Sequence, residues 1–315
     1  MEDITINRAK KKLLRRLSGG RIDLQASRKF ANLKALDPLR PFYKTIDYKV
    51  VSQDHTIPLR IYFPTEEDMQ EVRSELDILL FFHGGGWISE NIDNYNKICA
   101  RMARYTDSIV ISVEYRLAPE HPFPAGLIDC YTVTRALCTK GLGLGYETHP
   151  VTLIGDSAGG NLAAAVSLMA RDKKEFTLTR QILIYPVTGN DYTADSPFSS
   201  VHENGTDYLL TAQKMQDYVD LYKKSPADLA HPYFSPLQAV DLTEQPDTLL
   251  ITAELDPLRD EGEAYGMKLQ SAGNTVYMHR IQGAMHGYFA LGILSYHVDE
   301  TFTLINSFLR GNHIE

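Results

Sequence analysis

One stretch near the middle of the chain restricts the fold more than any other. Residues 151–154 are apolar and partly β-branched, residues 155–159 read Gly-Asp-Ser-Ala-Gly, and an Ala-rich segment follows. This pattern predicts a strand, a sharp turn and a helix. The two glycines would let strand and helix approach closely, which lifts the Ser157 hydroxyl clear of its own backbone. Ser157 is therefore the candidate nucleophile, and a purely structural glycine turn is the alternative.

The predicted helix would begin near Ala158. Its free backbone N–H groups and the positive end of its dipole would then face any oxyanion beside Ser157. A serine that attacks a carbonyl carbon needs such donors, because the carbonyl oxygen becomes negatively charged in the transition state. We therefore expect the N–H group of Ala158 to contribute to an oxyanion hole.

A second set of backbone donors is predicted after residues 78–82, an apolar run that reads as a buried strand. The next residues are His83-Gly84-Gly85-Gly86-Trp87. Three successive glycines imply that the backbone bends tightly or approaches another group within hydrogen-bonding distance. We expect Gly84, Gly85 and Gly86 to supply the remaining oxyanion donors, and the sequence does not decide which two of them donate. A plain glycine turn is the alternative.

His83 and Trp87 flank this loop, and neither is expected to donate to the oxyanion. We expect His83 to hold the loop by hydrogen bonds rather than to act as the general base. Trp87 is expected either to form a wall of the substrate pocket or to pack in the core, and the sequence favours neither.

Buried-type apolar runs alternate with helical stretches along the chain, which predicts a mostly parallel sheet with helices on both faces. Two further strands, at 48–52 and 59–63, flank a polar turn and are expected to form an antiparallel hairpin at a sheet edge. Together these segments predict an α/β fold with an eight-stranded sheet. The expected buried strands are residues 78–82, 109–113, 151–154, 182–185, 248–252 and 275–281.

The interval between the strands at 182–185 and 248–252 breaks the alternation. We expect residues 188–246 to form a small inserted cap, with a polar loop over 188–206 and one helix near 208–222. Residues 43–187 and 247–315 would form the core, and residues 1–42 would add N-terminal helices to the cap. Among these, residues 8–17 have the pattern of a basic amphipathic helix, and Leu24, Phe30, Leu33 and Leu36 continue a helical pattern.

The general base and its carboxylate partner are sought after Ser157, because in serine hydrolases with a parallel α/β sheet the acid and then the histidine follow the nucleophile. His286 lies just beyond the strand at 275–281 and has small neighbours. Asp256 follows the strand at 248–252 and precedes a proline that stiffens the turn. Glu254 is the alternative carboxylate. Asp260 and Glu261 suit the first turn of the next helix, where negative charge is favoured.

Ser157, His286 and Asp256 have complementary chemistry. A serine hydroxyl is a weak nucleophile at neutral pH, so His286 would accept its proton during attack and return that proton to the leaving alcohol. Asp256 would fix the tautomer of the imidazole and stabilise its protonated form.

Composition restricts the partners. The net charge of −8 argues against nucleic acid, whose binding surfaces are usually basic. Cys99, Cys130 and Cys138 form no C-x-x-C pair, so we expect free thiols and no zinc site. No N-terminal signal or long apolar run is present, which predicts a cytoplasmic protein without stable membrane association. We expect no cofactor and no metal, and the sequence is compatible with a homodimer without specifying one.

With these motifs assembled, the chain resembles the bacterial hormone-sensitive lipase family of α/β-hydrolase carboxylesterases. The resemblance rests on the glycine loop, the segment 115–125, the residues around Ser157, the run 256–261 and the run 286–288. It implies an α/β-hydrolase fold with a helical cap and cofactor-free hydrolysis of short- to medium-chain acyl esters, with Ser157, Asp256 and His286 as the triad. The chain departs at residues 245–247, Gln-Pro-Asp, where the family often has Leu-Pro-Pro.

Two other functions are weighed against a serine esterase. Hormone receptors that resemble this family bind ligands without catalysis, but they lack the histidine that His286 supplies here. An amidase or deacetylase of narrow specificity would use the same residues. A peptidase is disfavoured, because the insert is too short for the gating domain that oligopeptidase relatives carry.

Overall fold

Eight strands form one sheet, in the spatial order β1-β2-β4-β3-β5-β6-β7-β8. β1 pairs with β2, and β2 with β4, in antiparallel register, whereas every other neighbouring pair is parallel. The predicted eight-stranded, mostly parallel sheet and its edge hairpin are confirmed. The strands are β1 Thr45–Val51, β2 Thr56–Tyr62, β3 Ile78–Phe82, β4 Ile109–Val113, β5 Val151–Asp156, β6 Arg180–Ile184, β7 Asp247–Leu255 and β8 Val276–Met285.

The computed structural model describes residues 20–35, 37–71, 73, 75–146, 149–291 and 296–312. The basic helix expected at 8–17 and the expected helical residue Leu36 lie outside these residues. Within them the α-helices are α2 Leu24–Lys34, α3 Glu66–Gln70, α4 Asn96–Thr106, α5 Ala125–Lys140, α6 Ala158–Lys173, α7 Ser199–Asn204, α8 Ala212–Tyr222, α9 Arg259–Ser271, α10 Tyr288–Leu291 and α11 Tyr296–Leu309.

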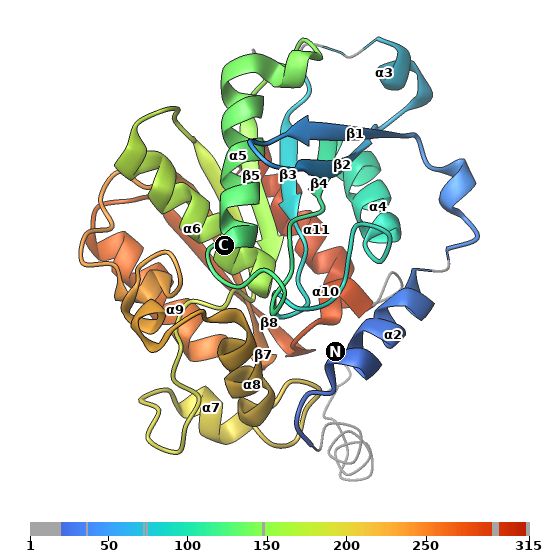
Figure 1. The fold of residues 1–315 in the computed structure, drawn as a ribbon. Helices are drawn as coiled ribbons and strands as arrows, with labels where there is room; N and C mark the ends of the chain where they lie inside the picture. Colours follow the sequence, from blue (N-terminus) through green and yellow to red (C-terminus); the bar gives the residue numbers. More distant parts are fainter. Residues whose placement is uncertain are drawn as a thin grey trace.

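Helices cover both faces of the sheet (Figure 1). Apolar side chains of α5, α6 and α9 pack on one face, and those of α4, α10 and α11 pack on the other. This arrangement explains why β3 is apolar at all five positions. Leu80 and Phe82 point into the first layer, whereas Leu79 and Phe81 point into the second, so every side chain of the strand is buried.

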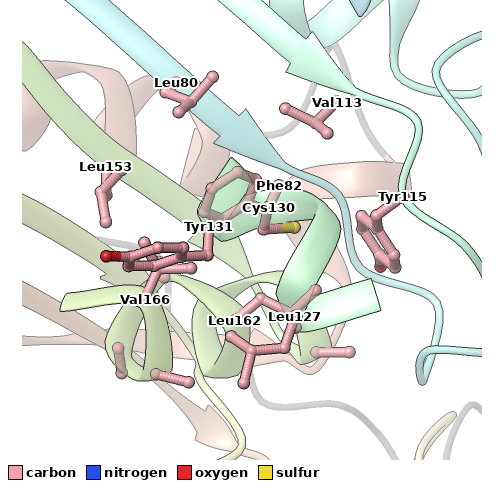
Figure 2. Close-up of a cluster of buried hydrophobic side chains, with 14 of the residues drawn as sticks. Leu80, Phe82, Val113, Tyr115, Leu127, Cys130, Tyr131, Leu153, Leu162 and Val166 are labelled. Atoms are coloured by element: carbon pink, nitrogen blue, oxygen red, sulfur yellow. The ribbon is translucent and has the colours of Figure 1, made fainter. Parts of the chain in front are cut away.

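The layer that supports Ser157 lies between the sheet and the helices α5 and α6. Figure 2 shows part of it, with side chains from β3, β4 and β5 meeting side chains from both helices. In α6 almost the whole helix is buried, and its alanines let it lie close to the sheet. The residues labelled there are Leu80, Phe82, Val113, Tyr115, Leu127, Cys130, Tyr131, Leu153, Leu162 and Val166.

The segment between β6 and β7 differs in part from the sequence-based expectation. The helix expected near 208–222 is present as α8, but the polar loop expected at 188–206 also contains a short helix, α7. Tertiary contacts stabilise α7 at both ends, because the Ser200 N–H group donates to Asp260 and the Asn204 side chain donates to the carbonyl of Asp256. A six-residue helix with no apolar periodicity is not detectable from sequence.

The N-terminal helix α2 attaches to the body mainly by polar contacts. Arg28 donates to the carbonyls of Ile88 and Ala118 and forms an ion pair with Glu120 at 2.7 Å. Leu24 is half-buried, as expected for a helix that packs a leucine on the body. Phe30 and Leu33 are instead 59 % and 60 % exposed, so the helical pattern of apolar residues here does not mark a buried face.

The three cysteines are free thiols, with Cys99 and Cys130 buried and Cys138 half-buried, as predicted. In the part of the chain that the structure describes, no helix is long and apolar enough to cross a membrane.

The hairpin turn between β1 and β2 is held to α5 by a histidine. His55 Nδ1 lies 2.7 Å from Asp54 Oδ1, and His55 Nε2 lies 2.8 Å from Oδ1 of the buried Asp129. The hydrogen bond with Asp54 is the main cause that raises the pKa of His55, and the contact with Asp129 adds to it.

A raised pKa in the folded state means that protonation of His55 stabilises the fold. This contribution is complete below the unfolded value of 6.5 and is lost as the pH rises through the folded-state pKa. We expect His55→Ala to lower the free energy of unfolding more at pH 5.5 than at pH 9, measured by urea denaturation. Gln53→Ala, at an exposed position of the same turn, is the control and should show no such pH dependence, because a glutamine side chain does not titrate. An equal loss at both pH values would contradict this assignment.

Candidate active site

Ser157 sits on a sharp turn between β5 and α6. Its backbone has φ 56° and ψ −118°, a conformation that a non-glycine residue adopts only when the surrounding structure enforces it. The flanking glycines permit this turn. A Cβ atom at Gly155 would lie 2.3 Å from the carbonyl oxygen of Gly159, and a Cβ atom at Gly159 would lie 1.9 Å from the carbonyl oxygen of Phe82. Both positions therefore require glycine, as the sequence predicted.

The three predicted side chains come together across the carboxyl ends of β5, β7 and β8. His286 Nε2 lies 2.9 Å from Ser157 Oγ, and His286 Nδ1 lies 2.7 Å from Asp256 Oδ2. Asp256 is fully buried, and its other oxygen accepts the N–H group of Leu258 at 2.9 Å. The carboxylate is thereby fixed in orientation, and it fixes the imidazole in turn.

The alternative acidic residues have other partners. Glu254 accepts the backbone N–H group of Gly283 at 2.6 Å. Asp260 and Glu261 lie in the first turn of α9, as predicted. Glu261 is completely buried and accepts the N–H groups of Thr188 and Gly189, where the segment after β6 begins. Burial raises the pKa of Glu261 to about 7.

The glycine loop lies beside the turn of Ser157, and its three glycines are not equivalent. The N–H group of Gly84 is 2.9 Å from Asp156 Oδ1 and 3.0 Å from Tyr95 Oη. Because this N–H group already has protein acceptors, Gly84 is not available to a substrate oxygen, and the expectation that it could donate is corrected. Within the described residues, the N–H groups of Gly85, Gly86 and Ala158 have no hydrogen-bond acceptor.

Asp156 is the residue of this site that the sequence analysis missed. Besides accepting from Gly84, it accepts from the hydroxyl groups of Tyr95 at 3.0 Å and Tyr185 at 3.2 Å. Burial raises its pKa to about 6, although these hydrogen bonds and the nearby His286 oppose the increase. Asp156 therefore ties the glycine loop to the nucleophile turn. Its place directly before Ser157 was the available signal, but its partners come from segments far away in sequence.

The two residues that flank the glycine loop are structural. His83 is buried and its Nδ1 atom lies 2.8 Å from the carbonyl of Gly84, so it holds the loop as expected. Burial lowers the pKa of His83 to about 4. Trp87 is 1 % exposed and stacks on Tyr222 of α8, with ring centroids 4.3 Å apart. Core packing, the second of the two expectations for Trp87, is therefore confirmed.

Two adjoining cavities meet at His286, and Ser157 lines one of them. The inner cavity, of about 140 Å³, is lined by Ser157, Gly85, Gly86 and side chains of α8. The outer cavity, of about 390 Å³, shares His286 with the inner one and extends between α8 and the residues just before α2. Leu209 lines the outer cavity, whereas the aromatic residues Phe198 and Tyr208 line neither.

A larger cavity of about 550 Å³ lies near the end of α6, lined in part by Arg171, Lys174 and Phe176. None of the predicted site residues lines it, so its size does not make it the active site. No group of three or more His, Cys, Asp or Glu side chains suited to a metal ion occurs among the described residues.

Comparison with known proteins identifies the family of this chain. Residues 79–290 match the family model described as the alpha/beta hydrolase fold. The chain belongs to the α/β-hydrolase family. This α/β-hydrolase is 36 % identical to an arylesterase of Saccharolobus solfataricus over 80 % of this chain and 79 % of that protein. It is 33 % identical to an ethyl acetate hydrolase of Pseudomonas putida over 82 % of this chain and 80 % of the relative.

Solved structures of esterases also resemble this chain. An esterase of the archaeon Pyrobaculum calidifontis superposes on this α/β-hydrolase with a TM-score of 0.84 and 32 % identity, covering 97 % of this chain and 98 % of the other. The family membership and these relatives place the chain among the carboxylic ester hydrolases. The family is not restricted to bacteria, because the esterase of Pyrobaculum calidifontis is archaeal.

The contacts of Asp156 generate a prediction for this α/β-hydrolase. Asp156→Asn keeps the shape of the side chain but presents an N–H donor where two tyrosine hydroxyl groups now donate. We expect the glycine loop to shift and kcat to fall by about tenfold to hundredfold, with a smaller change in KM. Steady-state kinetics on one ester measure both.

The same variant should lose activity without losing stability at pH 8. The folded-state pKa of Asp156, about 6, exceeds the unfolded value of 3.8. Ionisation of this carboxyl therefore lowers the free energy of unfolding, and the loss is complete at pH values above the folded-state pKa. We therefore expect Asp156→Asn to have a Tm at pH 8 at least as high as the parent. A lower Tm with unchanged kcat would contradict the role given to Asp156.

Proposed function

We propose that this α/β-hydrolase is a serine carboxylesterase that hydrolyses short- to medium-chain acyl esters through an acyl-enzyme intermediate. The observation that carries the proposal is the continuous chain of hydrogen bonds from Ser157 Oγ through His286 to Asp256, with lengths of 2.9 Å and 2.7 Å. It lies beside backbone N–H groups that lack acceptors within the described residues.

In the first half of the reaction, His286 accepts the proton of Ser157 while Oγ attacks the carbonyl carbon of the ester. The carbonyl oxygen becomes an oxyanion and is stabilised by the N–H groups of Gly85, Gly86 and Ala158. These donors are fixed before the substrate arrives, so little reorganisation is needed when the charge forms. Asp256 stabilises the imidazolium by its hydrogen bond to Nδ1.

In the second half, His286 gives its proton to the leaving alcohol as the tetrahedral intermediate collapses to an acyl-serine. Water then attacks the acyl carbon while His286 accepts a proton from it, and collapse of the second intermediate releases the acid and restores Ser157. Every proton is carried by His286, and no cofactor takes part in the proposed steps.

The inner cavity supports a short acyl chain. Its volume of about 140 Å³ equals that of about five water molecules in the liquid, which is the size of a small acyl group. Leu210, Met215 and Tyr218 enclose it on the side of the segment after β6. We therefore expect acetyl to hexanoyl esters to be preferred over long-chain esters.

The cap expected from residues 188–246 and 1–42 is also part of this proposal. Two contacts support it: the Ile22 N–H group donates to Asp217 of α8 at 2.9 Å, and both Ile22 and Lys214 line the outer cavity. Residues from both ends of the expected cap thus contribute to the same side of the active site.

A first test uses a series of p-nitrophenyl esters from acetate to palmitate, with Ser157→Ala beside the parent. We expect hydrolysis of the short esters and loss of all but trace activity in the variant, because the nucleophile is absent. Substantial turnover by Ser157→Ala would overturn the nucleophile assignment. A folded parent inactive on every ester would instead favour a ligand-binding protein or a hydrolase of narrow specificity.

The choice of carboxylate has a matched test. We expect Asp256→Asn to lower kcat by about 10⁴-fold, because the amide favours the wrong tautomer of His286. Glu254→Gln should have a much smaller effect, since the Glu254 carboxylate accepts the N–H group of Gly283 and a glutamine carbonyl oxygen can accept the same hydrogen bond. If Glu254→Gln proved the more damaging change in kcat, the assignment of Asp256 would be wrong.

A further inference from the structure

If the proposed function is right, the two cavities bind different parts of the ester, one the acyl group and the other the alcohol. Gly85, Gly86 and Ser157 line only the inner cavity, whereas His286 and Gly287 line both. The acyl group remains on Ser157 beside the oxyanion donors, while the alcohol must leave from the atom that receives the proton of His286. The acyl group therefore belongs in the inner cavity and the alcohol in the outer one.

The outer cavity is the larger of the two, about 390 Å³ against about 140 Å³. It can therefore hold an alcohol part considerably bulkier than the acyl part. Its apolar lining comes from Ile22, Leu209, Leu210 and Leu291, and its polar lining comes from the residues before and within α2 and from α8.

The charges that line the outer cavity favour an anion. Lys214 and Arg21 contribute two cations, and Asp23 contributes one carboxylate. Asp23 already caps α2, because its side chain accepts the N–H group of Ala26 at 2.9 Å. Neither Lys214 nor Arg21 forms an ion pair within the described residues.

Lys214 is the better placed of the two cations. It is half-buried, and its ammonium group donates to the carbonyl of Leu209 at 3.1 Å, which leaves two N–H groups for a ligand. Burial lowers the pKa of Lys214, as expected for an ammonium group without a carboxylate partner.

The inner cavity has the opposite character. Glu90 and the buried Asp156 both line it, and an anionic acyl group would meet these acidic side chains. An anionic group on the substrate is therefore disfavoured on the acyl side and favoured on the alcohol side. The excess of cations around the outer cavity is local, because the whole chain has a net charge of −8.

We propose that the preferred substrates are small acyl esters of a bulkier alcohol that carries a single carboxylate, which binds Lys214 in the outer cavity with support from Arg21. A monoanion suits the lining, because two cations are partly offset by Asp23. Lys214 is then a specificity residue for the alcohol part and takes no part in bond breaking.

The test compares two acetate esters of similar shape, 4-acetoxybenzoate and the neutral 4-acetoxybenzamide. The quantity measured is the ratio of kcat/KM for the anionic ester to kcat/KM for the neutral one. Comparing this ratio between protein variants cancels the intrinsic reactivity of the two esters. We expect Lys214→Met to lower the ratio by about fivefold or more, as for a partly exposed ion pair of about 1 kcal/mol.

Three controls accompany this variant. Lys224→Met removes a cation from an exposed position just after α8, outside both cavities, and should leave the ratio unchanged. Lys214→Arg keeps the charge and should retain most of the preference. Raising the ionic strength to 0.5 M should lower the ratio in the parent more than in Lys214→Met, because salt screens the pair.

The outcomes separate this proposal from the one it rests on. If the parent hydrolyses the neutral ester but Lys214→Met leaves the ratio unchanged, the carboxylate site is wrong and the esterase proposal stands. An equal fall in the ratio for Lys224→Met would also overturn the site, since a general charge effect would then explain it. If the parent hydrolysed the p-nitrophenyl esters but neither of these acetates, this inference alone would be overturned. If it hydrolysed none of these esters, the esterase proposal would be overturned and this inference with it.

Discussion

The close approach of three backbone segments is the constraint on which the active site depends. The end of β3, the turn after β5 and the start of α6 meet where Gly159 faces the carbonyl oxygen of Phe82. Even a methyl group at Gly159 would overlap that oxygen. This contact sets the glycine loop beside the serine turn, and it lets the N–H groups of both face the same point in space. The oxyanion donors are thus placed by backbone packing, independently of side-chain rotamers.

A buried acid, Asp156, connects the backbone segments of this crowded region by hydrogen bonds. Asp156 accepts hydrogen bonds from Gly84, Tyr95 and Tyr185, and so joins the loop after β3 to the turn after β5. A carboxylate is costly to bury, and its raised pKa reflects that cost. The arrangement illustrates how a functional site keeps a group that stability alone would not favour. It also decides between the glycines, because Gly84 supports the loop while Gly85 and Gly86 remain free to donate.

The segment after β6 gives the site its shape rather than its chemistry. Tyr222 of α8 stacks on Trp87, and Tyr218 lies against Gly86, where a Cβ atom would be 2.2 Å from its ring. The same helix therefore packs on the glycine loop and encloses the inner cavity. Lys214, one turn earlier, faces the outer cavity. The size and charge of the two cavities thus follow from how α8 sits on the core.

The sequence by itself determined the sheet and the residues of the hydrogen-bonded triad. Parallel strands buried on both faces are mostly apolar, and the turns at their carboxyl ends carry the glycines, Ser157, Asp256 and His286, so local pattern and chain order were sufficient. The tertiary structure alone decided the roles of Asp156 and Gly84, the exposure of Phe30 and Leu33, the existence of α7, and the charges around the outer cavity. Each of these depends on contacts between segments far apart in the chain, which neither periodicity nor motif spacing encodes.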